Sequence, residues 1–134
     1  MKYLADTHIL IWALSDDPKL TLEGREILLN SENTIYFSIV NVWEVGIKYS
    51  LHKECFNFSA EAFYSLCITS GYEMLPFSVN HIFTMETLKR PKNAPRHRDP
   101  FDRLLLAQAK TENICFLSHD SLLKDYHEPY LKNI

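Results

Sequence analysis

Short apolar strand patterns alternate with helical patterns along the whole chain, and this alternation restricts the fold more than any other feature. Runs of β-branched and aromatic residues are typical of strands, whereas apolar residues three and four positions apart indicate helices. We expect strands at residues 2–6, 34–38, 73–77 and 114–118, with a short edge strand in the C-terminal tail. We expect helices at about residues 9–14, 21–29, 40–50, 60–69, 79–88, 100–111 and 121–126. This order predicts an α/β fold with a central parallel sheet flanked by helices on both faces.

The chain has the size and composition of one compact domain. With 134 residues, 46% of them hydrophobic, it can bury a core without disulfides, and we expect a single domain over residues 1–134. Its cysteines, Cys55, Cys67 and Cys115, are odd in number and lack C-x-x-C spacing. That usage favours a reducing cytoplasm over a disulfide framework. No apolar run approaches the ~20 residues of a membrane span, so we expect no membrane partner.

Acidic residues occur where this fold would bring them together. Asp6 and Asp120 directly follow predicted strands, and Asp99 and Asp102 lie at the start of a predicted helix. Ligand sites of parallel sheets lie outside the carboxyl ends of the strands. Glu44, in the apolar helix at residues 40–50, is a fifth candidate. Converging carboxylates repel one another unless a cation lies between them, and oxygen ligands select Mg²⁺ or Mn²⁺. The sequence therefore predicts a metal site.

Each of these acids also has a purely structural interpretation. Asp99 precedes Pro100 and suits a helix N-cap, and Asp102 stands where a capping-box acid would. Asp6 and Asp120 could likewise cap the helices that follow them. A single Glu44 would ordinarily lie on a solvated helix face. Capping explains Asp102 least well, because the leucines after it bury its helix.

A basic loop leads directly into the acidic pair. Residues 89–98 contain no acid and five cations, namely Lys89, Arg90, Lys92, Arg96 and Arg98, in a chain of net charge −3. We expect these side chains to contact nucleic-acid phosphates, although a basic run is often only a solvated surface. With three glycines in the chain there is no glycine-rich phosphate loop, so ATP or dinucleotide use is not expected.

Four short motifs follow one another along the chain. They are Leu4-Ala5-Asp6-Thr7-His8, Ser38-x-x-Asn41-x-Trp43-Glu44-Val45, the run from His97 to Ala109, and Leu117-Ser118-His119-Asp120. Together they resemble PIN-domain ribonucleases, most closely the VapC-type toxins of bacterial toxin–antitoxin pairs. The resemblance implies a parallel sheet with flanking helices, Mg²⁺- or Mn²⁺-dependent RNA cleavage, frequent homodimerisation, and inhibition by an antitoxin whose peptide occupies the active site. Asn41 and Ser118 replace a common Ser and Thr, which puts only fine positioning in question.

The resemblance also assigns roles to the acids. Asp6, Glu44, Asp102 and Asp120 match the family's acidic quartet, which would hold the metal, and Asp99 matches an extra acid of one subgroup. We expect a cytoplasmic endoribonuclease in which water attack leaves a 5′-phosphate and a 3′-hydroxyl. Two alternatives stay open. One is a DNA or structure-specific nuclease using the same acids, and the other is a catalytically silent module that binds RNA or protein.

Overall fold

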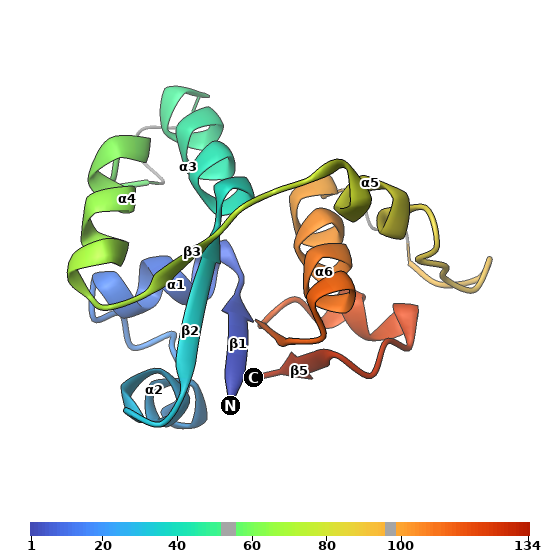
Figure 1. The fold of residues 1–134 in the computed structure, drawn as a ribbon, viewed down its shortest axis with the longest axis horizontal. Coiled ribbons are helices and arrows are strands. Elements are labelled where there is room, and N and C mark those ends of the chain that lie inside the picture. The colour runs from blue at the N-terminus through green and yellow to red at the C-terminus, as the bar shows by residue number, and fades with distance from the viewer. Residues whose placement is uncertain (52–55, 96–98) are drawn as a thin grey trace.

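Five parallel strands form the centre of the molecule (Figure 1). The computed structural model describes residues 1–51, 56–95 and 99–134. The strands are β1 (Lys2–Ala5), β2 (Thr34–Ser38), β3 (Glu73–Leu75), β4 (Cys115–Ser118) and β5 (Leu131–Asn133). The α-helices are α1 (Thr7–Leu14), α2 (Leu22–Leu29), α3 (Ile39–Leu51), α4 (Ala60–Thr69), α5 (Val79–Met85) and α6 (Pro100–Glu112), and a 3₁₀ helix, η1, spans Ser121–Tyr126. The predicted α/β class is confirmed.

Several elements differ from their predicted extent or type, and α1 begins at Thr7 rather than at residue 9 because Asp6 caps it. β3 ends at Leu75 rather than at residue 77, because Pro76 has no N–H to donate to a neighbouring strand. α5 ends at Met85, and the next residues form a turn in which the Leu88 N–H donates to the Met85 carbonyl at 3.1 Å. The predicted last helix is the 3₁₀ helix η1. These differences lie at element ends, where sequence patterns are least informative.

Side chains of β1 alternate between two hydrophobic cores. Tyr3 and Ala5 belong to the core that contains α1, α2 and α4, whereas Leu4 belongs to the core that contains α6. Because successive side chains of a strand point to opposite faces, these cores lie on opposite faces of the sheet. Figure 1 shows α4 and α6 on either side of the strands.

Strand order places a switch point beside β1. The chain moves outward from β1 to β2 and β3, then returns to the other side of β1 to form β4 and β5. Ala5 pairs with Leu117, and the Asp6 N–H donates to the Leu117 carbonyl at 2.9 Å. The ends of β1 and β4 are therefore adjacent, which is where open parallel sheets form ligand sites.

Two further predictions concern cysteines and membranes. Cys67 and Cys115 are free thiols, and Cys55 lies outside the described residues. Within the described part of the chain, no helix is both long and apolar enough to span a bilayer.

Candidate functional site: an acidic cavity at the switch point

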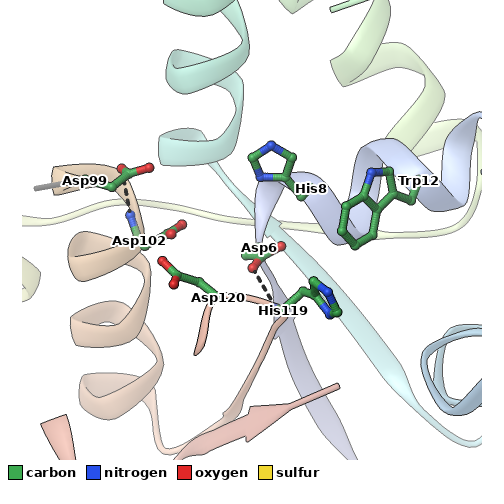
Figure 2. Close-up of a pocket in the computed structure, with 7 residues that line it drawn as sticks. All are labelled: Asp6, His8, Trp12, Asp99, Asp102, His119 and Asp120. Carbon is green, nitrogen blue, oxygen red and sulfur yellow. Dashed lines mark hydrogen bonds between the residues drawn. The ribbon is translucent and has the colours of Figure 1, made fainter. Parts of the chain in front are cut away.

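A cavity of about 300 Å³ opens where β1 and β4 end (Figure 2). It is lined by Asp6, His8, Trp12, Asp99, Asp102, His119 and Asp120. Four of the five acids predicted from the sequence therefore share one cavity. Figure 2 shows Asp99, Asp102 and Asp120 on one side, the rings of Trp12 and His119 on the other, and Asp6 between them.

Asp6 is held firmly at the base of the cavity. Its Oδ1 accepts the Ile9 N–H at 2.9 Å and so caps α1, while its Oδ2 accepts the Ser118 hydroxyl at 2.5 Å and the His119 N–H at 3.3 Å. The residue is only 3% exposed. Burial raises the pKa of Asp6 above its ordinary value, although these hydrogen bonds oppose the shift. The β1–β4 pairing thus positions the carboxylate.

Two more of the acids cap helices, as the structural interpretation predicts. Asp99 Oδ1 accepts the N–H of Phe101 at 2.9 Å at the start of α6. Asp120 Oδ1 accepts the N–H of Leu122 at 2.9 Å at the start of η1. A carboxylate has a second oxygen, so capping fixes these side chains in place without using all their ligand capacity.

Asp102 differs from the other three cavity acids. Burial, followed by the charges of Asp6, Asp99 and Glu44, raises its pKa to about 9, and a hydrogen bond with the Asp120 side chain adds to the shift. The Asp102–Asp120 pair therefore holds a proton at neutral pH. A bound cation would favour ionisation of this buried carboxyl group and offset the repulsion from its neighbours.

Glu44 lies behind the cavity rather than in its lining. It is 1% exposed, its Oε1 accepts the Thr7 hydroxyl at 2.5 Å, and its Oε2 pairs with Lys48. Lys48 Nζ also lies 3.9 Å from Asp99 Oδ2. Burial alone would lower the pKa of Lys48, but the Glu44 hydrogen bond and charge, with Asp99 and Asp102, raise it. The sequence analysis missed this cation, although an i, i+4 Glu–Lys spacing could have indicated it.

Asn41 ties the ends of β1 and β2 together. Its Nδ2 donates to the Thr7 hydroxyl oxygen at 3.0 Å and to the Ala5 carbonyl at 3.3 Å, and its Oδ1 accepts the Ser38 N–H at 2.6 Å. Thr7 in turn donates to Glu44. Asn41 therefore positions Thr7, and through it Glu44.

The acids fit a hard divalent cation by their chemistry. The acids offer carboxylate oxygens, and the neighbouring carboxylates contribute, after burial, to the raised pKa of Asp102. In the described residues, however, no three acidic, histidine or cysteine side chains are arranged closely enough to hold a metal ion. A bound ion would have to draw the carboxylates together.

The basic loop is only partly available to a ligand. Lys89 and Lys92 are exposed. Arg90 instead donates to Asp125 at 2.9 Å and to the Leu122 carbonyl at 3.3 Å, and it packs over the Tyr126 ring. Arg96 and Arg98, which were also predicted to bind RNA, lie outside the described residues.

Comparison with known proteins places this site in a family. The family description "PIN domain" matches residues 3–128. The chain belongs to the PIN-domain family. Among curated proteins, none has a significantly similar sequence.

Solved structures share the fold of this PIN domain at low sequence identity. VapBC2 from Rickettsia felis, bound to a promoter DNA fragment, matches with a TM-score of 0.68 at 21% identity, over 100% of this chain and 99% of that one. VapBC-1 from nontypeable Haemophilus influenzae matches with a TM-score of 0.66 at 16% identity, over 99% of this chain and 98% of that one. A toxin–antitoxin complex from Klebsiella pneumoniae matches with a TM-score of 0.58 at 18% identity, over 98% of this chain and 96% of that one.

Proposed function

We propose that this PIN domain is a metal-dependent endoribonuclease and the VapC-type toxin of a toxin–antitoxin pair. Asp102 carries the proposal. It faces three other acids in a cavity at the switch point, and burial together with neighbouring carboxylates raises its pKa to about 9. The similarity to VapBC and toxin–antitoxin structures supports the toxin assignment.

The proposed roles follow from the contacts of each acid. Asp6 and Asp102 would be the primary ligands of Mg²⁺ or Mn²⁺, with Asp120 and Glu44 completing the set directly or through water. When bound, the metal would supply an acidified water and neutralise charge on the scissile phosphate. Ser118 orients Asp6, and Lys48 pairs with Glu44. The proton held by the Asp102–Asp120 pair must leave before both carboxylates can bind a cation.

A catalytically silent binding module is the second candidate, and a specific observation favours it. Asp6, Asp99 and Asp120 all accept N–H groups at helix starts, so their presence does not require catalysis. Capping does not account for Asp102, whose burial among like charges makes ionisation unfavourable. We therefore favour the nuclease. A DNA-directed nuclease would use the same acids and would differ from the proposed ribonuclease only in its substrate.

The remaining proposals concern assembly and location. We infer one domain over residues 1–134 that works in the cytoplasm as a homodimer and binds a cognate antitoxin. An antitoxin peptide with an Arg or Lys could pair with the cavity carboxylates and compete with the metal.

Cleavage by the purified protein tests the proposed activity. Single-stranded RNA and DNA of matched sequence are incubated with Mg²⁺, Mn²⁺ or a chelator, and the new ends are mapped. We expect metal-dependent cleavage of RNA with 5′-phosphate ends, abolished in Asp6→Asn and Asp102→Asn. Asp16→Asn is the matched control, because that side chain is 88% exposed. Cleavage by Asp102→Asn at the wild-type rate would overturn the assignment. Cleavage of DNA alone would show that DNA, not RNA, is the substrate.

A further inference from the structure

Three aromatic rings line the wall of the cavity opposite most of the acids. They belong to His8, Trp12 and His119, from two segments far apart in the sequence (Figure 2). Trp12 meets His119 at a ring-centroid distance of 5.3 Å and an interplanar angle of 75°, and His8 lies 5.9 Å from Trp12 at 51°. We call these three residues the aromatic wall.

Core packing does not account for the whole wall. Trp12 is half-buried and packs against the core beneath α1, and His8 also lies 6.4 Å from the buried ring of Phe56. His8 and His119 are nevertheless exposed. Because Trp12 and His119 meet edge to face, their contact occupies a face of only one of the two rings. The rings line a space of about 300 Å³, which leaves them accessible to a flat ligand.

The charge of the cavity favours a source of RNA affinity there that does not depend on phosphates. Carboxylates at the cavity, such as those of Asp99 and Asp120, repel a phosphate backbone, and the chain as a whole carries a net charge of −3. Stacking of a base on an aromatic ring is insensitive to that repulsion, and every base has a face to offer. A wall of rings beside the acids could therefore hold a nucleotide near the reacting phosphate.

We propose that the aromatic wall is a nucleobase subsite, which stacks one unpaired base of single-stranded RNA next to the acidic cluster. The inference rests on the proposed function for the identity of its ligand. It goes further in assigning a binding role to His8, Trp12 and His119, and it requires the base to be unpaired. A base inside a duplex is stacked on its neighbours and cannot enter the cavity.

Binding to abasic RNA tests the subsite without changing the wall. The protein is the Asp102→Asn variant in a chelator, and the probes are short single-stranded RNAs with one abasic position moved along the chain. We expect one position at which loss of the base weakens binding by roughly 5- to 150-fold, since stacking contributes about that much per base. A duplex of the same sequence should bind much more weakly. Equal affinity at every abasic position would overturn the proposal.

Fluorescence reports on the ring itself. The chain contains two tryptophans, so Trp43→Phe in the Asp102→Asn background leaves Trp12 as the only one. RNA should quench that emission, and RNA abasic at the sensitive position should not. The reciprocal Trp12→Phe variant, which retains the 54% exposed Trp43, should show little quenching. Quenching of Trp12 by a basic peptide but not by RNA would instead identify the wall as a protein-binding surface and overturn the proposal.

His8 allows a test of stacking against charge. His8→Ala should weaken RNA binding several-fold, and His8→Phe should restore it, because the ring is kept while the capacity for positive charge is lost. The salt dependence of binding should be unchanged in both variants. A loss of affinity in His8→Phe equal to that in His8→Ala would contradict stacking at this residue. Because these are binding measurements, they remain informative even if the wild-type protein fails to cleave RNA, which would refute the proposed function separately.

Discussion

At the scale of single residues, the principal feature is the imbalance of charge around Asp102. Its position in the first turn of α6 favours a negative charge, because unpaired N–H groups point out of a helix N-terminus. Burial and the neighbouring carboxylates of Asp6 and Asp99 outweigh that effect and keep Asp102 protonated. A neutral side chain at this position should therefore leave the fold intact and impair only the function.

We predict that Asp102→Asn stabilises the metal-free protein increasingly as pH rises from about 4 to about 9. The folded-state pKa of Asp102 is about 9 against an ordinary 3.8, so wild-type stability from this group is complete below pH 3.8 and is lost as pH rises through 9. The pKa difference sets an upper limit of about 6 kcal/mol on the gain at pH 8.

Thermal unfolding across this pH range in a chelator measures the effect, with Asp16→Asn as the control. A difference in Tm between Asp102→Asn and wild type that stayed constant from pH 5 to pH 9 would show that Asp102 is not strained by its neighbours.

Asp99 should behave as a cap. We predict that Asp99→Ser keeps stability and most RNA cleavage, since Ser also caps well, whereas Asp99→Ala costs about 0.5–2 kcal/mol. Denaturant unfolding and cleavage rates of both variants provide the measurement. If Asp99→Ser is stable but as inactive as Asp102→Asn, Asp99 is part of the active site and its cap is secondary.

At the scale of elements, the basic loop and η1 act as one unit. Arg90 reaches from the loop to Asp125 and to the Leu122 carbonyl, both in η1, and η1 begins immediately after Asp120. The Arg90 side chain is only 13% exposed. The loop thereby supports one of the cavity acids, which gives Arg90 a structural role alongside the RNA contact proposed from the sequence.

We predict different consequences for the exposed lysines and for Arg90. Lys89→Gln with Lys92→Gln should flatten the slope of log affinity against log salt by up to about 1.4 without loss of stability, because each phosphate contact contributes about 0.7. Arg90→Gln should leave that slope nearly unchanged but cost roughly 1–3 kcal/mol of unfolding free energy.

A salt series of RNA binding in the Asp102→Asn background, paired with urea unfolding, distinguishes the two roles. Should Arg90→Gln remain fully stable and reduce the slope as each lysine does, Arg90 would be a phosphate contact and not an anchor.

At the scale of the whole molecule, the site draws on both ends of the chain. Asp6 comes from the first loop, and Ser118, which donates to it, comes from β4 more than a hundred residues later. The similar solved structures span nearly all of this chain and are toxin–antitoxin assemblies. Under the proposed toxin function, we expect the chain to act in an assembly rather than as an isolated monomer.

We predict that the purified chain forms a homodimer, with twice the 15.7 kDa mass of one chain, and that its gene lies beside a small antitoxin gene whose co-expression yields a complex lacking nuclease activity. Light scattering measures both masses. The released toxin should regain cleavage when the partner is removed. A monomer with no co-encoded partner would count against the toxin assignment but not against nuclease chemistry.

The sequence by itself determined the order and type of most elements and the identity of the acids. Apolar periodicity locates β2 and α4 at the residues observed, because such patterns reflect which faces must be buried. It also places Asp6 and Asp120 after strands and Asp99 before Pro100, since caps follow local rules.

Only the tertiary structure decided how those acids are used. Glu44 and Asp102 belong to the same motif set, yet one is paired with Lys48 behind the cavity and the other is crowded by carboxylates within it. Arg90 and Lys89 are adjacent in the sequence, yet one is anchored and the other exposed. Burial and charge depend on which residues pack together across the sheet, and that information is not contained in local spacing.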